Sequence, residues 1–252
     1  MSAGHLRSLL WTIPLAMGTT AVMITIAVVS SLFTRSSRWQ EWLYRKWAAM
    51  VLGIVGARVR VRHAERLDPR ANYVVVSNHL SLMDTPLLLG WLPVPFKFLA
   101  KRELLKVPFI GWYLNRAGHL TVDRGSVRST LASMNECARL IRERRLSVLI
   151  FPEGTRSQGE LQPFKDGAAY LAIQAGVPLA PVAIRGTGQV LPAKSSYFRP
   201  GDVELIIGEP VSVEGLTLKD RGALTAVLER RVRDLLQAAE PATAECAQSS
   251  RE

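Results

Sequence analysis

The chain has 252 residues, of which 48% are hydrophobic, so it is long enough for one sizeable domain with a small appendage. Its formal net charge of +11 indicates an anionic partner: a membrane surface, a phosphorylated substrate or a nucleic acid. Nucleic acid is disfavoured because the sequence has no RNA-binding aromatic signature, helix-turn-helix pattern or zinc-ligand spacing. The two cysteines, Cys137 and Cys246, form no metal-binding or redox pattern, so we expect no metal and no cofactor.

The first 56 residues are predicted to anchor the protein to a membrane. The run from Leu9 to Phe33 carries no charge, and about 20 apolar residues are enough to cross a bilayer. Pro14 and Gly18 lie inside this run, and two interpretations stay open, a single spanning helix or half of a re-entrant hairpin. More cations follow the run than precede it, which predicts that the rest of the chain faces the cytoplasm.

Residues 38–56 are predicted to form an amphipathic helix at the level of the lipid headgroups. Aromatic residues from Trp39 to Trp47 are interleaved with charges, as is common at that depth. The alternative is an ordinary surface helix that packs on the domain. From Ala57 to Arg62, valines alternate with arginines, which is typical of a half-buried strand with a basic outer face. That face contacts either anionic lipid or solvent.

Strands alternate with helices over residues 57–240. The further strand-like runs are 73–77, 96–100, 119–123, 147–151, 179–185 and 202–207. The helical patterns are 86–91, 126–144, 166–175 and 219–239. This alternation predicts an α/β domain with a largely parallel, mixed sheet flanked by helices, preceded by an N-terminal membrane-associated helical segment. The tail, residues 241–252, is small and polar and is predicted to be disordered.

A histidine and an aspartate mark the first candidate site. His79 follows a β-branched run, and Asp84 comes five residues later. Residues five apart on one helix point about 140° away from each other, so the pair meets only if residues 80–83 form a tight turn. Thr85 and Pro86 predict a helix start that Asp84 or Thr85 caps. A carboxylate that orients a histidine makes it a general base, whereas the structural alternative is a loop histidine beside a capping aspartate.

A second motif, Phe-Pro-Glu-Gly-Thr-Arg-Ser, occupies residues 151–157. With both motifs in place, the sequence resembles the 1-acylglycerol-3-phosphate acyltransferases, a family of glycerolipid acyltransferases. The first family signature is Asn-His, four residues and Asp, and the third is matched here in full. The four signatures are matched at 78–84, 118–124, 151–157 and 177–182. The second match is looser, because Leu120 and Thr121 stand where a more apolar pair is usual. The resemblance covers residues 50–215.

His79 is predicted to take the proton from a lysolipid hydroxyl as that hydroxyl attacks an acyl thioester, with Asp84 orienting the imidazole. Ser81 is an alternative acyl carrier. A turn or capping role is favoured for it, because no Gly-x-Ser-x-Gly elbow is present. His119 is predicted to be structural, since Asp123 would lie about 13 Å away along a strand.

The second motif is predicted to form a substrate-binding loop. Gly154 allows the backbone to approach a ligand closely, and Arg156 offers a forked donor for phosphate. Glu153 is expected to bond an acceptor hydroxyl or to order the arginine, whereas the structural alternative is a Glu153–Arg156 salt bridge. The resemblance implies that two further cations at strand ends help to hold the acceptor's phosphate. The predicted substrate-binding residues are Glu153, Gly154, Thr155, Arg156, Lys101 and Arg124.

Three functions of different class remain. The first is a membrane-bound acyltransferase that uses acyl-CoA or acyl carrier protein as donor and a lysophospholipid as acceptor. The resemblance implies 1-acylglycerol-3-phosphate as acceptor and phosphatidic acid as product, with another lysolipid such as lyso-ornithine lipid as the alternative. The second is a thioester or lipid hydrolase with the same histidine–aspartate pair, and the third is a non-catalytic binder of anionic lipid. The pair disfavours a binder, and the phosphate loop disfavours a hydrolase. The expected location is the inner membrane, with the catalytic domain facing the cytoplasm.

Overall fold

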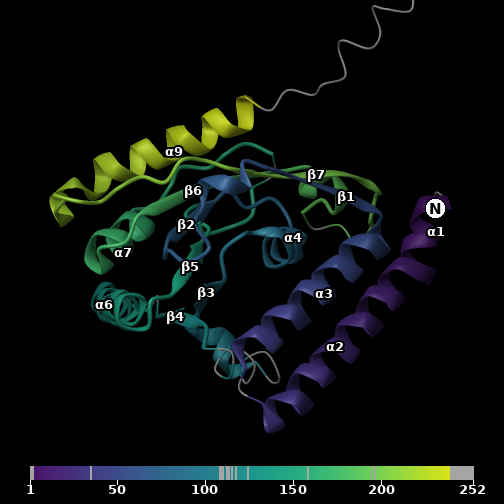
Figure 1. Cartoon of the computed structure of the whole chain (residues 1–252). Helices are drawn as coiled ribbons and strands as arrows, with labels where there is room; N and C mark the ends of the chain where they lie inside the picture. The colour runs from purple at the N-terminus through teal and green to yellow at the C-terminus, as the bar shows by residue number, and fades with distance from the viewer. Residues whose placement is uncertain are drawn as a thin grey trace, which may run out of the picture.

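Helices pack on both faces of one sheet, and two long N-terminal helices lie along one side (Figure 1). The computed structural model describes residues 3–34, 36–107, 111, 114, 116, 118–123, 125–157, 159–193, 195 and 197–238. The strands are β1 (Ala57–Arg62), β2 (Val74–Ser77), β3 (Phe96–Lys101), β4 (Leu120–Val122), β5 (Ser147–Ile150), β6 (Leu179–Arg185) and β7 (Gly201–Ile207). The α-helices are α1 (Ala3–Arg7), α2 (Ile13–Phe33), α3 (Ser37–Val55), α4 (Asp84–Trp91), α6 (Val127–Arg144), α7 (Gly167–Ala175), α8 (Thr187–Val190) and α9 (Arg221–Gln237).

The sheet is mixed and mostly parallel, with the strand order β1-β7-β6-β2-β5-β3-β4. Each neighbouring pair is parallel except β6 and β7, which run antiparallel. The predicted fold class is therefore confirmed, and each predicted strand agrees with an observed one to within one residue at either end. The short helix α8 was not predicted, because four residues are too few to show a helical period.

The central strand β2 separates two hydrophobic cores. Val74 and Val76 pack in a core with α6, α7 and α9, whereas Val75 packs with α3 and α4 on the opposite face. Successive side chains of a strand point to opposite faces, so a strand covered by helices on both faces needs an unbroken apolar run. This requirement explains why the sequence at β2 is a run of valines.

The N-terminal helices form an antiparallel pair in which α2 packs against α3 (Figure 1). The indole Nε1 of Trp47 donates to Thr20 Oγ1 at 3.1 Å across the pair. A π-helical turn, Ser8–Thr12, joins α1 to α2. There Ser8 Oγ donates to the carbonyl oxygen of Phe198 and accepts that residue's N–H, each at 3.1 Å. The start of the N-terminal pair is thus hydrogen-bonded to the segment that precedes β7.

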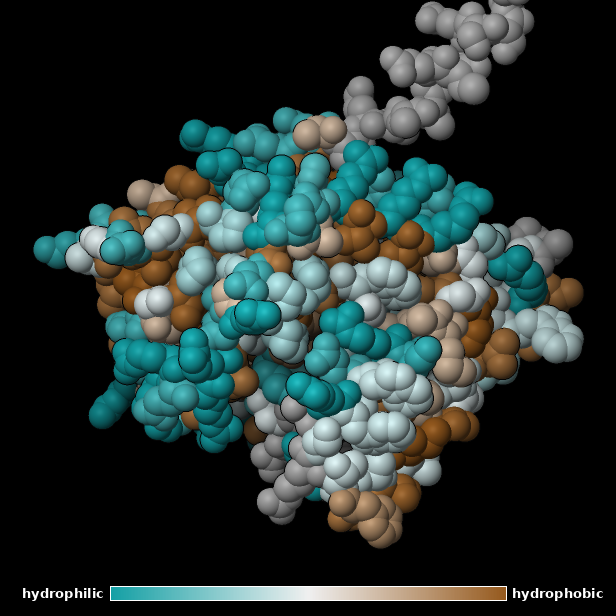
Figure 2. All heavy atoms as spheres, viewed as in Figure 1, coloured by the Kyte–Doolittle hydropathy of each residue, from teal (hydrophilic) through white to brown (hydrophobic). Residues whose placement is uncertain are grey.

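One face of these helices is apolar and exposed. Within the described chain one helix, Gly4–Phe33, is long and apolar enough to cross a membrane. Trp11 is 73% exposed and Phe33 is 85% exposed. Figure 2 shows the hydrophobic surface along the right and lower edge, over α2. By contrast α3 packs on α4, where the guanidinium of Arg45 donates to the carbonyl oxygens at the end of α4.

Candidate active site

The candidate site lies at the carboxyl ends of β2 and β5, which are parallel neighbours. His79 follows β2, and Glu153 follows β5. The carboxyl ends of parallel strands meet at one edge of a sheet, where α/β proteins commonly bind ligands. The two sequence motifs therefore come together, although these residues are 74 positions apart.

The segment before Asp84 forms the predicted turn. The backbone N–H of Asp84 donates to Ser81 O at 3.3 Å, and α4 begins at Asp84. The prediction that Asp84 or Thr85 caps this helix is wrong, because Met83 holds the cap position and no side chain caps it. Instead the carboxylate folds back over the turn. Its Oδ2 accepts from the backbone N–H groups of Leu80 at 2.7 Å and Ser81 at 3.0 Å.

The same carboxylate oxygen holds the imidazole of His79. Nδ1 of His79 lies 2.7 Å from Asp84 Oδ2, and Asp84 is fully buried whereas the His79 side chain is 20% exposed. An ionised carboxylate only accepts hydrogen bonds, so Nδ1 carries the proton and Nε2 keeps its lone pair. The ring also stacks on Phe151, with centroids 4.0 Å apart and planes inclined by 14°. Nε2 is thus available to accept a proton from a bound group.

Glu153 holds the backbone of His79. Its side chain is buried, with Oε1 accepting from the His79 N–H at 2.6 Å and Oε2 accepting from the Gln162 N–H at 3.0 Å. Burial raises the pKa of Glu153, while the two N–H groups act in the opposite direction. No ion pair joins Glu153 to Arg156 in the part of the chain that the structure describes, so the salt-bridge alternative is not observed. A contact with an acceptor hydroxyl stays a prediction.

The loop after this glutamate carries two cations. Gly154 has a φ of 78°, and a Cβ there would lie 2.8 Å from Lys165 Nζ, so the glycine makes room for the ammonium. Arg156 is exposed and has no hydrogen-bond or ion-pair partner among the described residues. Ser157 ties the loop to His79, because its N–H and Oγ donate to His79 O at 2.8 and 3.3 Å. Lys165 lies outside both motifs, so no sequence signal singled it out.

The remaining predicted substrate-binding residues lie in the same loop, farther along the same edge of the sheet, or outside the residues that the structure describes. Thr155 is exposed in the loop. Lys101 is the last residue of β3, where its ammonium lies 3.3 Å from the carboxylate of Glu103. Arg124 lies outside the residues that the structure describes. The roles of all three toward a substrate stay predictions.

Ser81 and His119 make structural contacts. Ser81 is fully buried, and its Oγ donates to Leu191 O at 2.8 Å, in agreement with the predicted turn role. Nδ1 of His119 accepts the N–H of Phe98 at 3.0 Å. Burial, together with the charge of Lys97, lowers the pKa of His119 to about 4. His119 is therefore neutral near pH 7 and belongs to the framework of β3 and β4.

The described residues provide neither a cluster of metal ligands nor a reactive thiol. Within the described ranges, no three His, Cys, Asp or Glu residues are grouped so that they could hold a metal ion. Cys137 is buried in α6, and burial raises the pKa of its thiol to about 11. A thiol with so high a pKa stays protonated and is a poor nucleophile at neutral pH.

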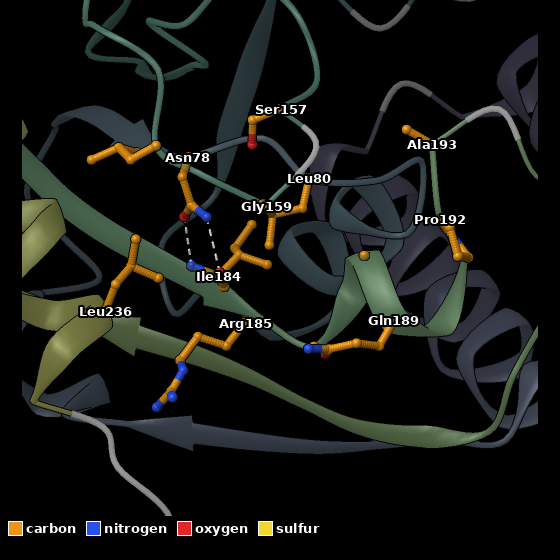
Figure 3. Close-up of a pocket in the computed structure, with 13 residues that line it drawn as sticks. Asn78, Leu80, Ser157, Gly159, Ile184, Arg185, Gln189, Pro192, Ala193 and Leu236 are labelled. Carbon is orange, nitrogen blue, oxygen red and sulfur yellow. Dashed lines mark hydrogen bonds between the residues drawn. The ribbon is translucent and has the colours of Figure 1, made fainter.

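A cavity of about 820 Å³, hereafter the β6 cavity, adjoins the site on the side of β6. Its wall includes Asn78 and Leu80, the two chain neighbours of His79. Figure 3 shows the Asn78 amide against Ile184: Nδ2 donates to Ile184 O at 2.9 Å, and the Ile184 N–H donates to Oδ1 at 2.7 Å. These bonds extend the β2–β6 ladder beyond Ser77, so the wall between the cavity and His79 is fixed.

The sequence is similar to known acyltransferases. A family model described as Acyltransferase matches residues 58–185. The human 1-acyl-sn-glycerol-3-phosphate acyltransferase alpha is 37% identical over 172 residues, which are 68% of this chain and 61% of that protein. The human beta protein is 37% identical over 182 residues, which are 71% of this chain and 64% of that protein. The chain thus spans less than two thirds of the length of these two relatives.

A solved structure has a similar fold. It is the crystal structure of the 1-acyl-sn-glycerophosphate (LPA) acyltransferase PlsC from Thermotoga maritima, with a TM-score of 0.76 and 28% sequence identity. The match covers 94% of this chain and 98% of that one. The similarity of fold therefore extends over nearly the whole chain and is not confined to the two motifs.

Proposed function

The chain belongs to the acyltransferase family, and on that premise we propose that it moves a fatty acyl group from a thioester donor to the free hydroxyl of a lysolipid. The donor is acyl-CoA or acyl carrier protein, and the acceptor is 1-acylglycerol-3-phosphate, which gives phosphatidic acid. Relatives whose names specify that acceptor support the choice. The observation that carries the proposal is the contact of 2.7 Å between His79 and a fully buried carboxylate.

In the proposed reaction His79 is the general base and then the general acid. Nε2 removes the proton of the lysolipid hydroxyl as that oxygen attacks the thioester carbonyl carbon. The carbon–sulfur bond breaks, and the imidazolium returns its proton to the leaving thiolate. Asp84 stabilises the imidazolium through Nδ1, and Glu153 acts as a positioning residue through the His79 N–H. No residue of the enzyme is acylated, so Ser81 keeps its turn role.

The cationic loop is the proposed site for the acceptor's phosphate. Arg156 has no partner among the described residues, and Ser157, its chain neighbour, is bonded to the backbone of His79. A guanidinium placed there can bind two phosphate oxygens and hold the lysolipid hydroxyl near Nε2. Lys165 adds a second positive charge beside Gly154. These cations favour a transferase over a hydrolase, because water needs no anion-binding site.

The proposed location is the inner membrane, with the catalytic domain on the cytoplasmic side. The exposed apolar face of α2 is suited to lipid. Contacts near both ends of this helix support a re-entrant arrangement over a spanning one. Ser8 is bonded to Phe198, and the carbonyl oxygen of Ser31 accepts from the guanidinium of Arg116. A helix held to the catalytic domain at both ends enters one leaflet with the site close to the lipid surface.

The test is a kinetic comparison of two acceptors, 1-acylglycerol-3-phosphate and the matching monoacylglycerol without phosphate. Purified protein in detergent is given labelled acyl-CoA or acyl carrier protein, and products are identified by mass. Arg156→Ala should raise the KM for the phosphorylated acceptor about tenfold or more, since a charged hydrogen-bond partner contributes about 1.5–3 kcal/mol. Arg156→Lys should be intermediate, because it keeps the charge and loses the fork.

The matched control is Arg142→Ala, which removes another exposed arginine near the end of α6. It should leave both KM values unchanged. If Arg156→Ala raised the KM for the two acceptors equally, the arginine would support the loop and the natural acceptor would carry no phosphate. Release of free fatty acid without any acylated lysolipid would show that the protein is a hydrolase and contradict the proposed transfer.

A further inference from the structure

The β6 cavity and the cationic loop both lie beside His79, and the cavity extends from the end of β6 to Ser157 and Leu161 in the segment that follows β5. In the sheet, β2 lies between β6 and β5. Ile184 and Arg185, at the end of β6, line the cavity, whereas Arg156 follows β5 and Lys101 ends β3. His79, just after β2, therefore stands between the cations that follow β5 and β3 and the part of the cavity that the end of β6 forms. Transfer between two substrates needs two sites that meet at one base, so the cavity is placed to hold the second substrate.

The wall of the β6 cavity combines apolar and polar groups. Leu80, Leu161 and Leu236 supply the apolar part, and Ser157 and Gln189 supply polar side chains. The volume of about 820 Å³ falls in the range of about 300–1,000 Å³ that is usual for small-molecule sites. A fatty acyl chain has no group that could use these polar side chains. A pantetheine chain has two amides separated by methylene and methyl groups, which suits this mixture.

Positive charge remains at the end of the cavity away from His79. In Figure 3 the Arg185 side chain extends away from Asn78, the residue that precedes the base. The carboxylate of Glu204 lies 2.9 Å from the Arg62 guanidinium and 3.6 Å from the Arg185 guanidinium. One carboxylate shared by two arginines leaves a net charge of one unit uncompensated. An anion at this end would give Arg185 a partner for its fork.

We propose that the β6 cavity binds the 4′-phosphopantetheine arm of the thioester donor. The phosphate binds Arg185, the two amides lie along the wall between Gln189 and Ser157, and the thioester reaches the end beside His79. This inference rests on the proposed transferase function. Acyl-CoA and acyl carrier protein carry the same arm, so the cavity serves either donor. The lysolipid hydroxyl then attacks from the side of β5, the carbon–sulfur bond breaks, and the thiolate takes the proton from the His79 imidazolium and leaves into the cavity as a thiol.

The experiment measures binding and kinetics on the full-length protein in detergent. The binding probes are 4′-phosphopantetheine and pantetheine, which differ only in the phosphate, and calorimetry reports their affinities without any turnover. Arg185→Gln should weaken 4′-phosphopantetheine about tenfold or more, as expected for the loss of one charged hydrogen-bond partner, and leave pantetheine unchanged. Arg62→Gln is the matched control, because Arg62 pairs with the same carboxylate and does not line the cavity.

Gly188→Leu provides a second variant that fills the cavity. A Cβ at Gly188 would lie 3.6 Å from Leu80 Cβ, which is ordinary contact, so a larger side chain extends along the wall. It should weaken both probes and raise the donor's KM while leaving the acceptor's KM unchanged. Donor KM values measured separately with acyl-CoA and acyl carrier protein identify which of the two carries the arm.

The outcomes separate this inference from the proposed function. Two results would overturn the site and leave the function standing. One is acyl transfer by a wild-type protein that does not bind 4′-phosphopantetheine. The other is an equal loss of affinity for 4′-phosphopantetheine in Arg185→Gln and Arg62→Gln. A rise of the acceptor's KM alone in Gly188→Leu would assign the cavity to the lysolipid and also overturn the inference. Binding that depends on Arg185 in a protein without transferase activity would support the site and refute the function.

Discussion

Replacing Asp84 by asparagine should separate the chemical role of this carboxylate from its structural role. Oδ2 accepts three hydrogen bonds, one from His79 Nδ1 and two from backbone N–H groups of the turn. An asparagine oxygen can still accept from the backbone groups, but it carries no charge to stabilise an imidazolium. We therefore expect Asp84→Asn to fold with reduced stability and to transfer acyl groups much more slowly.

The magnitudes follow from these contacts. A hydrogen bond to a charged group contributes about 1.5–3 kcal/mol and a neutral one about 0.5–1.5 kcal/mol, so three weakened bonds lower the free energy of unfolding by about 3 kcal/mol. The catalytic loss is of a different size. General acid–base catalysis contributes on the order of 10²–10⁴-fold, and an imidazole without its orienting anion should lose about 10²-fold in kcat. Both KM values should change little, because Asp84 is fully buried.

The assay is the initial rate at saturating donor and acceptor, measured beside a thermal melt. Ser81→Ala is the control, because Ser81 lies in the same turn and its buried hydroxyl bonds Leu191 O. That variant should lose about 1–3 kcal/mol of stability for the unpaired carbonyl and keep its kcat. The reasoning would be refuted if Asp84→Asn kept the same kcat as Ser81→Ala. A large loss of kcat in Ser81→Ala would instead support an acyl-serine intermediate.

Two further predictions concern stability and membrane attachment. Because the pKa of folded His119 is about 4, below its ordinary value of 6.5, the unfolded chain binds a proton first as the pH falls, so stability is lost between those two values. The free energy of unfolding, measured by urea titration, should be lower at pH 5 than at pH 7 by about 2 kcal/mol. His119→Asn, which keeps an acceptor for the Phe98 N–H, should lessen that difference. Equal pH dependence in the wild type and the variant would contradict the assignment. On the exposed face of the apolar helix Gly4–Phe33, the double variant Trp11→Glu, Leu15→Glu should move the protein from the membrane to the soluble fraction, whereas Leu131→Glu on the exposed face of α6 should not. Unchanged sedimentation with membranes would exclude this helix as the anchor.

Local pattern was enough to predict most elements of the fold. The valine run of β2 and the capped start of α6 at Ser126 each have a local physical cause, so they are readable without tertiary contacts. The order of strands in the sheet has no local cause. That β6 pairs with β2 and runs antiparallel to β7 depends on contacts between distant segments. The β6 cavity depends on this order and could not be predicted, because Leu80 and Arg185 meet only through it.

The candidate site shows the same division between residue types and their contacts. The motifs indicate which residues gather, and the turn between His79 and Asp84 is predicted by the strand signal before it and the helix signal after it, since the pair meets only if residues 80–83 form a turn. They did not indicate which atoms meet. Glu153 was expected to face an acceptor or Arg156, whereas both its oxygens accept backbone N–H groups. A buried carboxylate is stable only when it is hydrogen-bonded, and the available donors are known only once the loop path is known.

His79 is restrained at four points by groups from the start of α4 and from the segment that follows β5. Asp84 holds Nδ1, Phe151 covers one face of the ring, and Glu153 and Ser157 hold the backbone N–H and carbonyl oxygen. A base fixed in this way loses little conformational freedom when substrates bind, so their binding energy is available to align the hydroxyl and the thioester. This restraint gives the two motifs different roles. In the proposed mechanism the first motif provides the base, and the buried part of the second motif fixes its position. Arg156, which is exposed and has no partner among the described residues, is the residue that we propose selects the substrate.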